Sequence, residues 1–220
     1  MLDDVPYRTK LRFVKDAARA APDNPATGVH MAELATTFTR DDDDDKRALC
    51  EFIMEHWSDE PHAAADARGL LKQLDRIGEP CAFEFDDLLS GERVDSVSLR
   101  GSPVLVMIWS GGIYETIESE LKRLRDLRAR APKLPVVGIF NFRHQDGADA
   151  LAAQLREHSV DWPHWYDEEE FSTPWGEGPF STNRTPLYFV LDRAGVIRSV
   201  GYRLATVEAK LEELTRVRQV

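Results

Sequence analysis

Two cysteines are the side chains of this sequence best suited to nucleophilic or redox chemistry, because a thiolate attacks disulfides and also binds soft metals. Cys50 and Cys81 lie far apart, in segments of different character. Their spacing indicates neither a disulfide framework nor a zinc cluster, and predicts two buried thiols. Cys81 precedes strand-like sequence and does not open a helix, so we expect no lowered pKa there.

Histidines and one acidic run are the residues that could bind a metal. His144, His158 and His164 show no ligand spacing, so the sequence indicates no metal site and no cofactor. Residues 41–45 are aspartates followed by Lys46. This run can be read as a metal site or as the DDDDK sequence that enteropeptidase cleaves, but acids also complement the positive end of a helix dipole. We interpret it as the start of a helix.

Residues 103–121, with the sequence PVLVMIWSGGIYETIESEL, predict a strand, a turn and a helix. A buried apolar run ends at Trp109, and Gly111 and Gly112 follow as a turn. Apolar residues then recur at helical spacing. A Gly-Gly turn at a helix N-terminus could cradle an anion.

The rest of the second half indicates an α/β domain. The run LPVVGIFNF, residues 134–142, is typical of a buried parallel strand. Helices are expected at 148–158 and 207–217, and a hairpin over 187–202 that turns at 192–195. The order βαβα followed by ββα predicts a mixed sheet flanked by helices. Its strands are expected at 103–109, 135–141, 187–192 and 196–202.

The first 77 residues contain an internal repeat. A shift of 36 residues pairs Pro25 with Pro61 and Leu34 with Leu70. Each unit reads as helix, proline-containing turn and helix, the pattern of tetratricopeptide-like arrays. We expect helices near 7–20, 26–39, 43–57 and 61–76. Two hairpins are fewer than such arrays usually contain, so this part should depend on its neighbour for stability.

The boundary between the two parts is expected at residues 78–80, where helical periodicity stops and strand-like sequence begins. The sequence therefore predicts a helical domain over 1–77 and an α/β domain over 78–220.

Four motifs in the second domain resemble the redoxin domains of the thioredoxin superfamily, specifically the TlpA-like branch and its alkyl hydroperoxide reductase relatives. They are GEPCAFEFDDLLSGERV, LRGSPVLVMIW, VDWPHWYD and TPLYFVLDRAGVI. The resemblance covers residues 78–217 and implies a thioredoxin-like fold. It also implies thiol-disulfide chemistry by a Cys-x-x-Cys motif after the strand that ends at Trp109. A helical, repeat-like N-terminal extension also occurs in that family.

This sequence lacks that redox motif. By the resemblance, the two cysteine positions fall on Ile113 and Thr116, and neither side chain supplies a thiolate. No shifted frame restores the motif, because residues 82–220 contain no cysteine. Pro186 matches the cis-proline of the family, which implies a retained groove for an extended peptide; equally, Pro186 could simply end a loop and start a strand. The residues of the implied groove are Trp109, Gly111, Gly112, Tyr114, Thr185 and Pro186.

Aromatic residues gather in the segment 162–184, which is otherwise rich in acids and prolines. Such side chains on a long loop are typical of a surface that binds a partner, and equally of an insertion that packs its own aromatics. The residues concerned are Trp162, Trp165, Tyr166, Phe171 and Trp175.

We therefore expect a redox-inactive thioredoxin-fold protein that acts as a protein-binding or assembly module. The alternatives are a thiol oxidoreductase or peroxidase with a displaced site at Cys81 or Thr116, and a structural protein whose helical repeats recruit a partner. A net charge of −11 argues against nucleic acid or an anionic membrane as the partner. No apolar stretch is long enough to span a bilayer. We expect a soluble, cytoplasmic chain, or an exported one if a leader had been removed.

Overall fold

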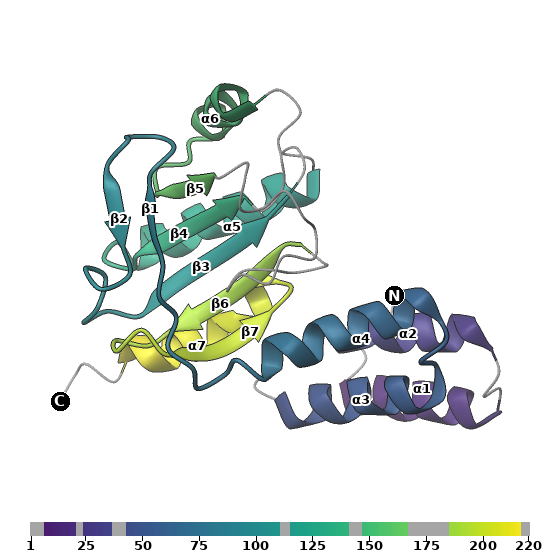
Figure 1. The fold of residues 1–220 in the computed structure, drawn as a ribbon. Helices are drawn as coiled ribbons and strands as arrows, with labels where there is room; N and C mark the ends of the chain where they lie inside the picture. The colour runs from purple at the N-terminus through teal and green to yellow at the C-terminus, as the bar shows by residue number, and fades with distance from the viewer. Residues whose placement is uncertain are drawn as a thin grey trace. The chain divides into compact units, whose positions relative to one another are not determined.

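The computed structural model describes residues 7–20, 24–36, 43–110, 115–140, 147–166 and 185–216 (Figure 1). The chain divides into two compact units, Met1–Asp75 and Arg76–Val220. The division falls just before the boundary expected from the sequence. Arg76 belongs with the second unit, because its guanidinium carbon lies 5.1 Å from the centroid of the Phe189 ring.

The first unit is helical in its described residues. Its helices are α1 (Tyr7–Ala20), α2 (Pro25–Thr36), α3 (Asp43–His56) and α4 (Pro61–Leu74), close to the expected ranges. The start of α4 shows why it forms there, because Pro61 occupies its first turn and the Glu60 carboxylate accepts a hydrogen bond from the Ala63 amide. Helix α2 contacts α1, α3 and α4. A Cβ atom on Gly28 of α2 would come within 2.9 Å of the ring of Trp57, the residue that follows α3. Helix α2 therefore packs closely against the end of α3.

The acidic run opens α3 as the sequence predicted. Asp43, Asp44 and Asp45 occupy the first turn of the helix, where their charges meet the positive end of the helix dipole. Lys46 is buried, and its ammonium group lies 2.7 Å from the Asp43 carboxylate. Residues 41 and 42 lie outside the described residues.

The second unit contains a five-stranded mixed sheet with strand order β5-β4-β3-β6-β7 (Figure 1). The strands are β3 (Val104–Trp109), β4 (Val136–Phe140), β5 (His164–Tyr166), β6 (Leu187–Leu191) and β7 (Ile197–Gly201). Strand β4 runs parallel to β3 and β5, whereas β6 is antiparallel to β3 and β7. The sequence predicted β3, β4, β6 and β7 in one sheet, with β6 and β7 as a hairpin, and this is confirmed. It did not predict β5.

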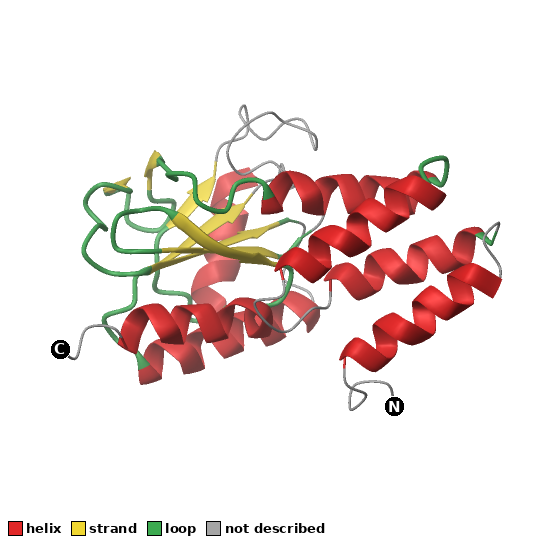
Figure 2. Ribbon diagram, turned by 90° about the horizontal axis from the view of Figure 1, so that it is seen from below, coloured by secondary structure: helices red, strands yellow, loops and turns green. Residues whose placement is uncertain are grey.

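The three central strands are buried on both faces. Every residue of β3, β4 and β6 is buried, so their sequences are continuous apolar runs without alternation. Helices α5 (Glu115–Arg130), α6 (Gly147–Glu157) and α7 (Leu204–Arg216) share a core with one face of the sheet. Helices α5 and α7 lie side by side on that face (Figure 2).

A segment that we call the edge strap, residues 78–88, pairs with both outer strands of the sheet. At β7, the Gly78 amide donates to the Ile197 carbonyl oxygen, with an N···O distance of 2.9 Å. At β5, the Leu88 amide donates to the His164 carbonyl over 2.9 Å, and Asp87 Oδ1 accepts from the His164 amide over 2.7 Å. Exposed strand edges invite pairing with other chains, and the strap occupies part of each edge.

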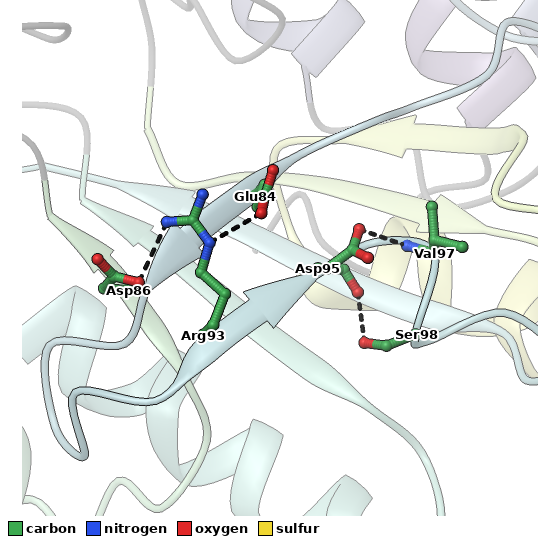
Figure 3. Close-up of polar contacts among 6 residues, drawn as sticks. All are labelled: Glu84, Asp86, Arg93, Asp95, Val97 and Ser98. Atoms are coloured by element: carbon green, nitrogen blue, oxygen red, sulfur yellow. Dashed lines mark hydrogen bonds and ion pairs between the residues drawn. The ribbon is translucent and has the colours of Figure 1, made fainter.

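Near its end the edge strap contains β1 (Glu84–Asp86), which forms an antiparallel hairpin with β2 (Arg93–Asp95). On its outer side, Arg93 bridges two carboxylates, with Nε 2.9 Å from Glu84 and Nη1 3.1 Å from Asp86 (Figure 3). Between these acids Phe85 points inward, is buried, and stacks on Trp165 of β5 with ring centroids 5.5 Å apart. The alternating sequence of β1 thus separates a charged outer side from an aromatic inner side.

Candidate functional site

The end of β3 and the start of β6 bring two hydroxyl side chains together. The strands are antiparallel with Ile108 opposite Leu187, so Ser110, which follows β3, lies beside Thr185, which precedes β6. Ser110 Oγ and Thr185 Oγ1 are 2.8 Å apart, and either oxygen can donate the hydrogen bond. Ser110, Thr185 and Pro186 are all partly exposed, and we call them the hydroxyl-pair site. The Thr185–Pro186 peptide bond is cis.

Ser110 is a site residue that the sequence patterns did not single out. A serine after an apolar strand carries no signal of its own. Only the pairing of the strands identifies it. In an antiparallel pair, the residue just after the end of one strand lies beside the residue just before the start of the other. The structure thus places a second hydroxyl beside the predicted site positions Thr185 and Pro186.

Trp109 was expected to line an open groove, and this expectation is wrong. Its side chain is fully buried, with its ring centroid 4.8 Å from that of Phe140 and 6.1 Å from that of His164. Side chains alternate along a strand, so Trp109 points to the same face as Met107, into the core beneath α5. Its indole therefore belongs to the protein core and not to an exposed surface.

The other expected groove positions are only partly covered by the structure. Gly111, Gly112, Ile113 and Tyr114 lie outside the described residues. Helix α5 begins at Glu115, which places the backbone of Thr116 in its first turn. The start of α5, the end of β3 and the start of β6 therefore meet at one end of the sheet (Figure 1).

A buried hydrogen-bond network fixes these elements to one another. The Tyr188 hydroxyl of β6 donates to Glu120 Oε2 of α5 over 2.7 Å, and the Leu204 amide donates to the same oxygen over 3.1 Å. Burial, reinforced by the neighbouring Glu120 carboxylate, raises the pKa of Tyr188 well above its ordinary value, so the phenol remains a donor. The network joins α5 and α7 to β6 close to Pro186 and holds the site in shape.

Neither thiol is suited to nucleophilic chemistry. Cys50 lies buried in α3, and burial raises its pKa to about 12. Cys81 is also buried, and burial raises its pKa although Arg76 opposes the shift. The Cys81 amide donates to the carbonyl of Gly195, in the turn after β6, so this thiol lies at the opposite end of β6 from Pro186. The thiolate fraction at neutral pH is small at both positions.

Part of the expected aromatic loop belongs to the fold. Trp162 is buried in the core, and Trp165 and Tyr166 are partly buried residues of β5. Trp162 therefore offers no surface to a partner, because its indole is buried, with the Arg128 guanidinium over its ring and the His164 ring 6.1 Å away. Phe171 and Trp175 lie outside the described residues.

His164 is a core residue and is not placed as a metal ligand. Its Nδ1 lies 3.1 Å from the Trp162 carbonyl oxygen, which can only accept, so Nδ1 carries the proton. The described residues contain no group of three or more His, Cys, Asp or Glu side chains that could hold a metal ion. Among the same residues, no helix has both the length and the apolar character that crossing a membrane requires.

No protein-family model matches this sequence, and no curated protein matches it. Solved structures do resemble the fold. The C-terminal domain of a proposed thiol-disulfide oxidoreductase from Bacteroides thetaiotaomicron has a TM-score of 0.54 and 17% identity, and the alignment covers 64% of this chain and 97% of that one.

Two further solved structures are similar to the same extent. An uncharacterised conserved protein from Geobacillus kaustophilus has a TM-score of 0.53 and 17% identity, over 66% of this chain and 84% of that one. A DsbF homologue from Corynebacterium diphtheriae has a TM-score of 0.50 and 20% identity, over 61% and 84%. The chain therefore has a thioredoxin-like fold, with a mixed sheet flanked by helices, together with a helical region.

Proposed function

We propose that this protein is a redox-inactive thioredoxin-fold module that binds an extended segment of a partner protein at the hydroxyl-pair site. The observation that carries the proposal is the direct contact between Ser110 Oγ and Thr185 Oγ1, 2.8 Å apart, at the sheet end where the resemblance places a dithiol. Hydroxyl groups recognise amide groups by hydrogen bonding but do not exchange disulfides.

The chemistry of the site fits recognition of a peptide backbone. Thr185 and Pro186 precede β6 and are partly exposed, so backbone groups there can pair with an extended chain, as in β-strand addition. The Ser110 hydroxyl supplies a further donor or acceptor beside them. By the resemblance, Gly111, Gly112 and Tyr114 are further residues of the proposed groove, and Ile113 and Thr116 take the two cysteine positions.

The helical unit is proposed as a second binding surface of the tetratricopeptide-like kind. Its four described helices form two successive hairpins, and α2 packs against both α3 and α4. This arrangement supports stacking of one hairpin on the next, which is how such arrays build the surfaces that recruit other proteins. The aromatic residues Trp165, Tyr166, Phe171 and Trp175 are a further proposed part of the partner contact in the second unit.

A thiol-disulfide oxidoreductase or peroxidase remains the second candidate. It is favoured by the solved structures of similar fold, because two of those described above carry oxidoreductase or Dsb names. In this chain such chemistry would have to use Cys81 or Cys50, whose thiols are buried and have raised pKa values. For this reason we rank it second.

Two assays separate the candidates. Insulin reduction with dithiothreitol and peroxide consumption should both proceed at the uncatalysed rate in the presence of this protein. Turnover that is lost in Cys81→Ser would establish the second candidate and overturn the first.

Binding is tested with arrays of extended peptides and fluorescence anisotropy of the best binders. Ser110→Tyr fills the hydroxyl-pair site and should weaken binding by about tenfold or more, the effect of losing a central contact. Ser98→Tyr, at an exposed position in the turn that follows β2 (Figure 3), is the matched control and should bind like the unmodified protein. Equal affinity of the two variants would show that peptides bind elsewhere.

A further inference from the structure

A surface hollow lies between the C-terminal half of α5 and the chain that joins α6 to β5. Its volume is about 320 Å³, at the lower end of the roughly 300–1,000 Å³ typical of small-molecule sites. The residues that line it are Arg125, Arg128, Ala129, Pro132, Ser159 and Asp161. It is separate from the hydroxyl-pair site, because the ten residues from the start of α5 to Arg125 span about 15 Å of helix.

Two guanidinium groups dominate this hollow. Arg125 and Arg128 are three residues apart on α5 and therefore share one helix face. The Arg128 side chain lies over the Trp162 ring, 5.6 Å from its centroid, with Nε fully buried and without a hydrogen-bond partner among the described residues. The side chain as a whole is still 26% exposed, so its terminal amino groups reach the surface. The indole thus holds this arginine in a fixed orientation.

The opposite wall of the hollow is a fixed stretch of backbone. Arg125 Nη1 donates to the His158 carbonyl oxygen. Ser159 adopts the left-handed conformation with φ 54°, and its amide donates to the Arg156 carbonyl over 3.0 Å. Asp161 pairs with Arg128, but its side chain is 71% exposed, so solvent weakens that ion pair. Among the residues that line the hollow, the two arginines carry positive charge and only Asp161 carries negative charge. The lining therefore has a net positive charge, although the protein as a whole is acidic.

We propose that this hollow binds the phosphate group of a small phosphate monoester. A guanidinium group presents its N–H donors in a fixed fork that matches phosphate oxygens, and two such groups here can share one dianion. The Ser159 hydroxyl offers a further donor to the anion. Ala129 and Pro132 give the hollow an apolar wall beside the charged groups, which suits the organic part of an ester. This proposal is independent of the proposed peptide-binding function.

Isothermal titration calorimetry at low salt, on the full chain, tests the proposal with phenyl phosphate and inorganic phosphate as probes. Phenyl phosphate should bind saturably and more tightly than inorganic phosphate, because only the ester contacts the apolar wall. Arg125→Gln should weaken binding about tenfold, the effect of one lost charge-assisted hydrogen bond. Asp161→Asn should tighten it about threefold, because it removes the carboxylate that competes for Arg128.

Arg123→Gln is the matched control, because Arg123 is exposed on the same helix and does not line the hollow. It should leave the affinity unchanged, and thermal unfolding of each variant checks that the fold is retained. The proposal is overturned if Arg123→Gln weakens binding as much as Arg125→Gln, or if Asp161→Asn weakens it. Equal affinities for the two probes would overturn the assignment to an ester, and absence of saturable binding would overturn the site altogether.

Discussion

His164 couples the stability of the second unit to pH. Burial lowers the pKa of its imidazole from 6.5 to about 4, and its Nε2 lies so close to Gly138 that a Cβ atom there would come within 2.1 Å. As pH falls through 6.5 the ring takes up a proton in the unfolded chain, whereas in the folded chain it stays neutral until about pH 4. The unfolded state binds more protons in this window, so stability must fall as the solution is acidified.

We expect the free energy of unfolding of the second unit to drop by about 3 kcal/mol between pH 7 and pH 4 from this residue alone. Urea titrations followed by tryptophan fluorescence measure the change. His164→Gln should lose most of this pH dependence, whereas His158→Gln, at a partly exposed position, should retain it. An unchanged urea midpoint between pH 7 and pH 4.5 in the unmodified protein would contradict the prediction.

Asp87 and Asp86 are neighbours with different structural roles. Asp87 accepts hydrogen bonds from the Ser90 hydroxyl and from the amides of His164, Leu89 and Ser90. Burial alone would raise the pKa of Asp87, but these hydrogen bonds hold it below its ordinary value. Asp86 is exposed and contacts Arg93 in an ion pair at the surface.

Asp87→Ala should therefore lower the free energy of unfolding by about 2–4 kcal/mol, because several donors lose their acceptor. Asp86→Ala is the matched control and should cost less than about 0.5 kcal/mol, as is usual for an exposed ion pair. Urea denaturation at neutral pH measures both values. Similar losses in the two variants would show that Asp87 does not fasten the edge strap to β5.

At the scale of single residues, the sequence predicted which residues lie near the candidate site better than it predicted where their side chains point. Thr185 and Pro186 were expected beside the end of β3, and Thr185 does contact Ser110 there, whereas Cys81 was correctly expected to have no lowered pKa. Trp109 was assigned to the groove, but its side chain points into the core. Successive side chains of a strand point to opposite faces of the sheet, so a shift of one residue reverses the face. Ser110 was missed, because only its hydrogen bond to Thr185, far along the chain, makes it part of the candidate site.

At the scale of elements, the stability of α3, which begins with the acidic run, can be tested by proteolysis. The sequence DDDDK over residues 42–46 is an enteropeptidase site, yet Lys46 and Arg47 lie within α3, and Lys46 is buried. A protease needs an extended segment, so α3 must unfold locally before the bond after Lys46 can be cut.

We expect the native protein to resist enteropeptidase and to be cut after Lys46 only when α3 is destabilised. Cys50→Asp, which places a charge at a fully buried position of α3, should make cleavage much faster. Glu51→Asp, at an exposed position of the same helix, is the control and should stay resistant. Gel electrophoresis with mass spectrometry follows the products, and rapid cleavage of the unmodified protein would show that α3 is not stable over residues 43–47.

The elements themselves were predictable where their patterns were long. Strands β3, β4, β6 and β7 and the helices of the first unit appear close to their expected ranges, because each carries a clear apolar run or helical period. Strand β5 was missed. It has three residues, and it is defined by its contacts with β4 and the edge strap and not by any pattern of its own.

At the scale of the whole molecule, the thioredoxin-like fold followed from the order of elements and from the motifs that resemble redoxins. The absence of cysteine from residues 82–220 was also evident from the sequence. What the sequence could not provide was the hollow beside α5, because its residues come from a helix and from a loop that only the folded chain brings together. The chain divides between Asp75 and Arg76, two residues before the boundary that the sequence indicated.

The two units differ in the kind of side chain they bury. Described core residues of the first unit include many alanines, each of which removes little apolar surface from water: Ala18, Ala32, Ala35, Ala63, Ala64 and Ala67. The second unit buries large aromatic side chains: Trp109, Phe140, Trp162, Tyr188 and Phe189. The second unit should therefore be the more stable of the two when each is made alone.

We expect a chain of residues 76–220 to fold with a cooperative thermal transition, and a chain of residues 1–75 to have reduced helicity or a lower midpoint. Circular dichroism measures both. A chain of residues 78–220 is the matched control: it lacks Arg76 and its contact with the Phe189 ring, so it should be less stable than 76–220 by about 0.5–2 kcal/mol. Equal stability of 76–220 and 78–220 would show that Arg76 does not contribute to the second unit. A more stable 1–75 fragment would contradict the argument from buried surface.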